Sequence, residues 1–351
     1  MMSNAMGAHA QTKQADSALP QRIFSHQSNE FKERFNHLPF SFSHNLGEHP
    51  LFEIPRLRRL AETLWTKTGN IVFFTDSPTL DQGWNRSKRR GASLAQAFSR
   101  LEETNSWILL KSIQEEPEYR VMLDRCLDEL QELTGVPLRK QITWVDAYVF
   151  IASPNTMTPY HIDHESNFLL QIHGDKEVNL FDPDDKTILT DPEIENYYIG
   201  DLSGARYRPE IQTKAKVFKI TSGTGVHHPV RAPHWVRNGH SYSVSLSVLF
   251  FMREFDLQAR VYQANHYLRK LNMVPTPPGS SPWKDKVKSL LFSDFGRSHR
   301  NKSDVIRYGL KKYHAPANFA RKLAQRFGIA TKSALSEDAG AAVNREGATS
   351  K

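Results

Sequence analysis

The residues that could do chemistry begin at His161 and Asp163, which are separated by a single apolar residue. In an extended strand, the side chains at positions i and i+2 point to the same face. One imidazole and one carboxylate would therefore converge on one point. A second histidine from a distant strand would complete a set of two histidines and one carboxylate, which suits non-haem Fe(II) and leaves coordination positions open.

The third ligand has to come from elsewhere, because a His-x-Asp triplet arises often by chance and does not make a metal site alone. Taken alone, the triplet is more typical of a hydrogen-bonded strand histidine than of a metal ligand. The later part of the chain offers four further histidines: His227, His228, His234 and His240.

Short strands separated by turns surround these residues. Alternation and β-branched content predict strands over residues 144–151, 167–172, 177–181, 217–220 and 241–252. The last of these places Ser on one face and larger apolar residues on the other. Many short strands with regular turns are typical of a β barrel or sandwich, so a mainly β core is expected.

Helical periodicity brackets this β region, which makes the expected fold α+β overall. Helices are predicted over 49–68, 92–103, 119–133, 257–271, 282–292, 303–313 and 317–327, and two further strands over 71–74 and 107–110. Residues 1–29 and 331–351 have no apolar periodicity and are expected to be disordered. The expected organisation is a domain over 30–255 and a basic helical region over 256–330.

Bulk properties indicate an ordinary soluble chain of 351 residues with 39% hydrophobic and 24% charged residues. No apolar run approaches the length of a membrane span, and no signal-peptide pattern opens the chain. The one cysteine, Cys126, excludes an internal disulfide. We therefore expect a protein of the reducing cytoplasm that does not contact a membrane.

Positive charge is concentrated at the C-terminus. Residues 256–351 contain 18 Lys and Arg against 7 Asp and Glu, a net charge of +11, whereas the preceding 255 residues carry −3 of the total of +8. Such a region could recruit an acidic partner, such as RNA, DNA or an acidic protein segment. The alternative is a solvated helical face, which is the commoner meaning of a charge run. The lysines and arginines beyond residue 282 are the candidates for recruitment: Lys284, Lys286, Lys288, Lys311, Lys312, Arg321 and Lys322.

Two blocks of the sequence resemble the JmjC-type, cupin-fold oxygenases that depend on Fe(II) and 2-oxoglutarate, especially the asparaginyl-hydroxylase-like branch and its bacterial relatives. The first block is T-x-x-H-x-D-x-x-x-N-x-x-x-Q-I-x-G-x-K-x-x-x-L-F, from Thr158 to Phe181. The second is P-x-x-A-P-H-W-V-x-N, from Pro229 to Asn238, followed by the alternating Ser/Val strand. Together they cover residues 144–251, just under a third of the chain.

The resemblance implies a double-stranded β-helix of the cupin or jelly-roll type and a catalytic domain over 30–255. It also implies a dioxygenase that hydroxylates a protein, peptide or small molecule, using O2 and 2-oxoglutarate and forming succinate and CO2. The distal ligand implied is His234, which joins His161 and Asp163 on Fe(II). His227 and His228 are then expected to be strand or substrate-side residues, and His240 to face solvent.

The cosubstrate residues implied are Lys176, Thr158, Asn167 and Ser247. Lys176 lies fifteen residues after His161, across a hairpin at Gly174, so that its ammonium could pair with the distal carboxylate of 2-oxoglutarate. The alternative for Lys176 is a surface lysine on an edge strand. The other three could donate hydrogen bonds to the cosubstrate or fill the barrel as polar residues.

Several features stay open at this point. His164 follows the carboxylate on the opposite face and is either a surface histidine or a substrate contact. Residues 186–214 form an insertion that either binds something or is structureless. A cupin-fold regulatory or binding protein without catalysis is the alternative function, followed by a nucleic-acid adaptor. The helices after Phe255 could also form a homodimer interface through Leu257, Val261, Leu268 and Leu271.

Overall fold

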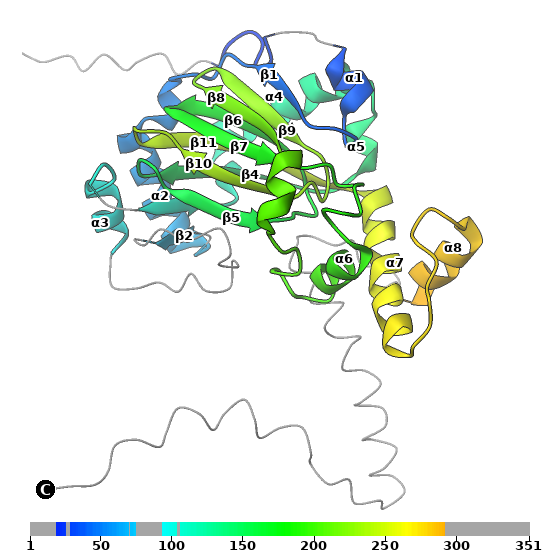
Figure 1. Cartoon of the computed structure of the whole chain (residues 1–351). Coiled ribbons are helices and arrows are strands. Elements are labelled where there is room, and N and C mark those ends of the chain that lie inside the picture. Colours follow the sequence, from blue (N-terminus) through cyan, green and yellow to red (C-terminus); the bar gives the residue numbers. More distant parts are fainter. Residues whose placement is uncertain (1–18, 26–28, 70, 75–92, 104–105, 292–351) are drawn as a thin grey trace, which may run out of the picture.

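The computed structural model describes residues 19–25, 29–69, 71–74, 93–103 and 106–291 of the 351. Two antiparallel β-sheets form its centre (Figure 1). The larger sheet has seven strands in the order β1 (Phe40–Ser43), β9 (Thr224–His228), β6 (Ser166–His173), β11 (Ser243–Met252), β4 (Ile142–Ala152), β3 (Trp107–Leu110) and β2 (Ile71–Phe74). The smaller has four in the order β5 (Met157–His161), β10 (His234–Asn238), β7 (Asp175–Leu180) and β8 (Lys216–Thr221).

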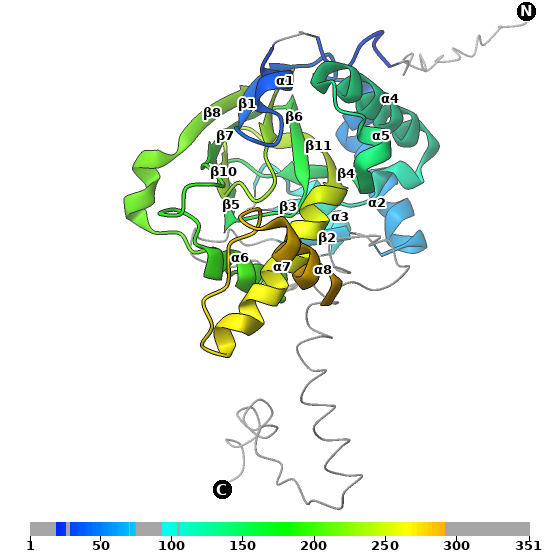
Figure 2. The same ribbon diagram turned by 90° about the vertical axis from the view of Figure 1, so that its right-hand side faces the viewer.

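Helices cover the outer face of the larger sheet and extend from one end of the core (Figure 2). The α-helices are α1 (Glu30–Arg34), α2 (Ile54–Lys67), α3 (Leu94–Ser99), α4 (Pro117–Thr134), α5 (Leu138–Gln141), α6 (Asp191–Tyr198), α7 (Arg253–Lys270) and α8 (Pro282–Leu291). Three short 3-10 helices are η1 (Pro50–Phe52), η3 (Ile113–Glu115) and η4 (Pro209–Lys214). The predicted mainly β core with flanking helices, α+β overall, is therefore confirmed.

The alternation of β11 explains how the larger sheet can be buried on both faces. Val244, Leu246, Val248 and Phe250 pack into one hydrophobic cluster with α2 and α4. The serines between them point to the other face, towards the smaller sheet, and they are buried as well. The predicted two-faced strand is thus correct, but neither of its faces meets solvent.

Packing between the two sheets fills only part of the space they enclose. A small apolar cluster joins them, with Leu169, Val226, Val178, Phe218 and Val236 among its members. The remaining interior space lies near the end of β5 and the start of β10, where the cavity described below opens.

The described residues include part of a segment that the sequence predicts to be disordered. Residues 19–25 fall within the segment expected to be disordered, yet Ile23 and Phe24 are buried in the main core. The Glu129 carboxylate on α4 accepts the backbone N–H groups of both residues at 2.9 Å, and Phe24 bridges to His44. That expected segment is therefore too long at its C-terminal end.

The C-terminal helices are anchored to the core. α7 packs against α6, and it buries Val261 while leaving Leu257 and Leu271 exposed. In α8, Lys288 is buried, and its ammonium donates to the Thr276 carbonyl at 2.8 Å. The prediction that Lys288 helps to recruit an acidic partner is therefore wrong. The helices predicted over 303–313 and 317–327, with four of the candidate basic residues, lie outside the described residues, and recruitment of an acidic partner stays a prediction.

In the part of the chain that the structure covers, no helix has both the length and the apolar character that crossing a membrane would require.

Candidate metal centre and its cavity

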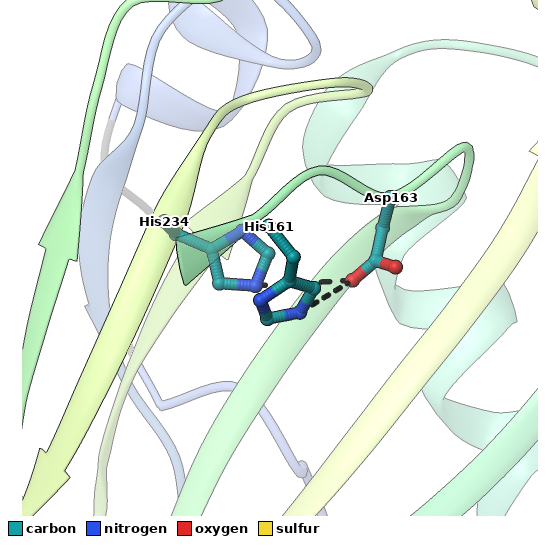
Figure 3. A group of neighbouring side chains, drawn as sticks. All are labelled: His161, Asp163 and His234. Atoms are coloured by element: carbon teal, nitrogen blue, oxygen red, sulfur yellow. Dashed lines mark ion pairs between the residues drawn. The ribbon is translucent and has the colours of Figure 1, made fainter. Parts of the chain in front are cut away.

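Strand pairing brings the three predicted ligands together. In the smaller sheet His234, the first residue of β10, lies directly opposite His161, the last residue of β5. Asp163 follows two residues later, just beyond the end of the strand rather than within it. Its carboxylate lies 3.4 Å from Nε2 of His161 and 3.8 Å from Nε2 of His234 (Figure 3).

This group has the composition and spacing of a metal site. One ligand atom from each residue lies within 4.8 Å of the other two, so that a single ion could contact all three. Both histidines are nearly buried, whereas the Asp163 side chain keeps 29% of its surface exposed. Two imidazoles and one carboxylate on one side of an ion leave its other side open.

Backbone carbonyls fix which nitrogen each ligand histidine presents. Nδ1 of His161 lies 2.7 Å from the Pro159 carbonyl, and Nδ1 of His234 lies 3.0 Å from the Ala232 carbonyl. A carbonyl oxygen only accepts, so each Nδ1 carries the proton and donates it. The two Nε2 atoms therefore direct lone pairs towards the carboxylate, which is the arrangement that metal-binding histidines usually show.

His227 is a structural residue, in agreement with its expected place in a strand. Its Nδ1 contacts the Asn167 carbonyl at 3.0 Å, and its Nε2 accepts the Asn36 backbone N–H at 3.0 Å. The ring stacks on Phe168 with a centroid distance of 4.5 Å. Burial lowers the pKa of His227 to about 3, so the ring is neutral. Both ring nitrogens already have hydrogen-bond partners. His240, by contrast, is exposed as predicted.

His228 points to the opposite face of β9 and lines the cavity. Its ring lies edge-on to His234 with a centroid distance of 4.6 Å. Burial and the neighbouring His234 hold its pKa well below the usual value, so the imidazole is neutral. Neither ring nitrogen has a hydrogen-bond partner among the described residues, which leaves an acceptor and a donor facing the interior.

A cavity of about 530 Å³ adjoins the three candidate ligands. Its wall includes all seven residues that the sequence predicts for the site: Thr158, His161, Asp163, Asn167, Lys176, His234 and Ser247. The larger sheet supplies further wall residues from β4, namely Trp144, Asp146, Tyr148 and Phe150. These four occupy alternate positions of a strand that the sequence predicts, so alternation along that strand could identify them as one face.

Lys176 is a buried cation in the wall of this cavity. Its side chain is 7% exposed, and its ammonium lies 5.9 Å from the centre of the Phe150 ring in the opposite sheet. The described residues include no acid within ion-pair distance of it. Burial alone lowers the pKa of Lys176 to about 7. The alternative of a surface lysine on an edge strand is therefore wrong.

Thr158, Asn167 and Ser247 face the same cavity from β5, β6 and β11. Asn167 Oδ1 is buried without a hydrogen-bond partner in the described part of the chain. Ser247 lies opposite Leu169 on β6 and Tyr148 on β4. These positions suit hydrogen bonding to a bound molecule, although each role stays a prediction.

His164 is neither a surface residue nor a wall residue of this cavity, so both alternatives considered for it are wrong. It is 1% exposed, and its Nε2 donates to the Asp256 carboxylate on α7 at 2.8 Å. Its Nδ1 contacts the Tyr198 hydroxyl on α6, also at 2.8 Å. His164, the residue after Asp163, is thus tied to both helices at this end of the molecule.

The insertion at residues 186–214 is ordered rather than structureless. It contains α6, whose first turn has a capping box formed by Thr190 and Glu193, and the 3-10 helix η4. Tyr197 from α6 reaches the cavity wall. The insertion therefore contributes to the wall of the cavity.

Comparison with known proteins gives a family match and several structural similarities. Residues 74–272, more than half of the chain, match the family described as a cupin-like domain. Among solved structures, the chain is similar to Escherichia coli YcfD, with 14% identity over 87% of this chain and 72% of that one and a TM-score of 0.45.

A second YcfD structure, described as a ribosomal oxygenase in complex with cobalt and 2-oxoglutarate, has 13% identity over 87% and 71% of the two chains and a TM-score of 0.41. The DMSP lyase DddQ from Ruegeria pomeroyi is similar over a smaller part, with 15% identity, 30% of this chain, 38% of that one and a TM-score of 0.20. No curated protein sequence matches the chain.

Proposed function

Because the chain belongs to the family of cupin-like domain proteins, we propose that it is an Fe(II)- and 2-oxoglutarate-dependent oxygenase, and more narrowly a hydroxylase. One observation carries this proposal. A single cavity holds a two-histidine, one-carboxylate group and a buried ammonium that has no acid partner in the described part of the chain. The first suits a metal ion, and the second suits an organic anion.

The metal would be held by Nε2 of His161, Nε2 of His234 and a carboxylate oxygen of Asp163. The fit is supported by the two Nδ1–H groups, which donate to backbone carbonyls and leave the Nε2 lone pairs for the ion. Three protein ligands on one side leave room for a chelating cosubstrate. Fe(II), with 2-oxoglutarate and O2, would supply the oxidation of the substrate, with succinate and CO2 as coproducts.

The cosubstrate fit rests on Lys176. On β7, Lys176 pairs with Asn238 of β10, four residues along that strand from His234, which is roughly 13 Å of extended chain. The Lys176 side chain extends into the same cavity, so the distance from its ammonium to the metal ligands is shorter than this backbone separation. The remaining distance is on the scale of a short dicarboxylate. The ammonium would bind the distal carboxylate, while Thr158, Asn167 and Ser247 would donate or accept hydrogen bonds along the molecule.

Part of the remaining wall is apolar. Leu109, Leu169, Val236 and Leu249 present apolar surface to the cavity. An apolar wall strengthens the attraction between Lys176 and a carboxylate, because charges interact more strongly where water is absent. The protein's part is thus to orient the cosubstrate and keep its site dry.

The proposal can be tested by anaerobic calorimetry of 2-oxoglutarate with the Fe(II)-loaded full chain. We expect binding that requires the metal, followed by succinate formation when O2 is admitted. The matched controls are His240→Ala, an exposed histidine change, and His161→Ala, which removes a ligand. If the metal-loaded wild type does not bind 2-oxoglutarate, the oxygenase proposal fails and the reading as a regulatory metal-binding cupin protein takes its place.

A further inference from the structure

Two loops present the candidate ligands that come from different parts of the sequence. Residues 162–165 follow β5 and include Asp163, and residues 229–233 lead into β10, which begins at His234. A backbone hydrogen bond joins the loops, because the N–H of Arg231 donates to the Asp163 carbonyl at 2.8 Å. The two histidines are held by the pairing of β5 with β10, whereas Asp163 lies beyond the end of its strand. The position of its carboxylate therefore depends on what holds these loops.

Each loop sends one polar side chain away from the cavity. His164 from the first loop is 1% exposed, and Arg231 from the second is 7% exposed. Neither belongs to the cavity wall. Both reach instead towards α6 and α7, which pack side by side at this end of the molecule (Figures 1 and 2). A buried arginine or histidine is usually retained because of what it contacts.

The Arg231 side chain is anchored on α7. The centre of its guanidinium lies 5.5 Å from the centre of the Phe255 ring and 5.6 Å from that of the Tyr262 ring. Its Nη2 donates to Oε1 of Gln258 at 3.1 Å. These three partners all belong to the first half of α7, and a guanidinium is attracted by the faces of aromatic rings. Arg231 therefore connects the loop before His234 to this helix.

The backbone of Arg231 adopts a conformation that arginine does not favour. Its φ is +63°, in the left-handed region, which is uncommon for any residue other than glycine and costs free energy. Glycine would fit this turn without that cost. An arginine at this position is explained if its side-chain contacts on α7 contribute more than the backbone conformation costs. The same residue thus contacts Asp163 through its backbone and α7 through its side chain.

Tyr198 on α6 connects the two buried side chains. Its hydroxyl lies 2.8 Å from Nδ1 of His164 and also interacts with the Arg231 guanidinium. Nε2 of His164 donates to the Asp256 carboxylate, which belongs to α7. The residue that follows Asp163 and the residue that holds the Asp163 carbonyl are therefore tied to the same two helices. Contacts that orient metal ligands in this indirect way typically change metal affinity 10–100-fold when they are removed.

We propose that His164 and Arg231 are positioning residues that fix the two loops on α6 and α7 and thereby set where Asp163 lies relative to His161 and His234. The inference rests on the metal site of the proposed function, but not on its cosubstrate. Because a coupling between two events acts in both directions, metal binding should also stabilise the first half of α7. The helix that leaves the sheets is thus part of the support of the metal site.

The test uses the full chain and Co(II) alone, whose visible absorption reports the geometry of its ligands. Arg231→Met keeps the length of the side chain and removes the guanidinium, and His164→Phe keeps a ring and removes both hydrogen bonds. For each variant we expect Co(II) affinity to fall about 10-fold or more in calorimetry. The absorption spectrum of the Co(II)-saturated variant should also differ from that of the wild type.

Two control variants separate positioning from general stability. Arg269→Met makes the same change in an ion pair between the same two helices, where Nε of Arg269 lies 2.8 Å from the buried Glu195 carboxylate. His227→Phe makes the same change at another buried histidine with two hydrogen-bond partners. Both controls should lower the free energy of unfolding in urea. Neither should change the affinity for Co(II) or its spectrum.

Hydrogen–deuterium exchange measures the coupling from the other side. In the wild type, Co(II) should slow exchange in residues 253–262 of α7 more than in α4, which serves as the reference helix. In Arg231→Met at saturating Co(II), this additional protection of α7 should be reduced. This readout requires neither 2-oxoglutarate nor turnover.

The inference is overturned if folded Arg231→Met and His164→Phe proteins both bind Co(II) with the affinity and spectrum of the wild type. It is also overturned if the two controls weaken Co(II) as much as these variants do, or if the wild type does not bind Co(II). Should Arg231→Met not fold, His164→Phe and the exchange of the wild type decide the question. A wild type that binds Co(II) but not 2-oxoglutarate would refute the oxygenase proposal and leave this inference standing.

Discussion

Replacing Lys176 with methionine should separate the stability of the protein from its ability to bind 2-oxoglutarate. Methionine has a similar length and no charge, so it can occupy the same buried position in β7. The ammonium it removes is buried, lacks an acid partner in the described part of the chain, and has a pKa lowered to about 7. The native lysine therefore destabilises the ligand-free protein, and its removal should be stabilising.

The size of this effect follows from the two pKa values. An unfolded chain holds the Lys176 proton up to its ordinary pKa of 10.5, whereas the folded protein releases it near 7. The unfolded state therefore binds more protons between these values, and the stability of the ligand-free protein should rise with pH across this window. The native lysine costs roughly 4 kcal/mol at pH 7 and roughly 2 kcal/mol at pH 9. Lys176→Met should recover most of this.

The same substitution should weaken 2-oxoglutarate binding by about 1.5–3 kcal/mol, the scale of a hydrogen bond to a charged group. In the wild type, a bound carboxylate should raise the pKa of Lys176, so binding above pH 7 should take up a proton. The protonated fraction of free Lys176 falls from about one half at pH 7 to about one thirtieth at pH 8.5, so affinity should fall about 15-fold.

Urea denaturation at pH 7 and 9 measures the first effect, and calorimetry in two buffers of different ionisation enthalpy measures the proton uptake. Metal saturation has to be held constant across the pH series. Lys219→Met, an exposed lysine on the neighbouring strand β8, is the matched control and should change neither quantity. A destabilised Lys176→Met protein, or 2-oxoglutarate binding without proton uptake at pH 8.5, would refute this reasoning.

Three further substitutions test the assignments around the metal ligands. His161→Ala should abolish binding of Fe(II) or Mn(II) in a titration, whereas His240→Ala should bind as the wild type does; unchanged affinity in the first would remove His161 from the ligand set. His227→Phe should leave metal affinity unchanged but cost about 1–3 kcal/mol of stability, because two backbone groups lose their partner; a loss of metal would mean that this ring is a ligand after all. Asp256→Ala should lower the free energy of unfolding by about 1.5–3 kcal/mol, because the buried His164 and Thr143 both lose their acceptor. Urea denaturation measures this loss, and an unchanged free energy of unfolding would show that these contacts are not formed in solution.

Local pattern was sufficient for several of the strands, but not for the full set of candidate metal ligands. The alternation of residues 241–252 predicted β11, because both of its faces have a consistent chemical character. The strand β10 (His234–Asn238) was not predicted, because it has only five residues and they show no clear alternation of polar and apolar side chains. The choice of His234 among four histidines depended on the resemblance and not on spacing. The reason lies in the pairing of His234 with His161, which is a contact across 73 residues of sequence.

The role of His164 shows what local reasoning could not reach. Strand alternation predicted that His164 points away from Asp163, and His164 is indeed not among the residues of the cavity that Asp163 lines, although neither residue lies in a strand. Alternation could not show what covers His164. In the structure α6 and α7 cover it, and their Tyr198 and Asp256 satisfy both ring nitrogens. Those partners lie 34 and 92 residues away in the sequence, so only the packing of the two helices identifies them.

The distribution of unsatisfied polar groups supports a ligand in this cavity more strongly than any motif does. Buried polar atoms in proteins are almost always hydrogen-bonded, and buried charges are almost always paired. Around this cavity the described residues break that rule at Lys176, at both nitrogens of His228 and at Oδ1 of Asn167. Each exception destabilises the ligand-free protein. A set of such exceptions converging on one space is best explained by a bound molecule that supplies the missing partners, since a cavity with no ligand would be more stable with apolar side chains at these positions.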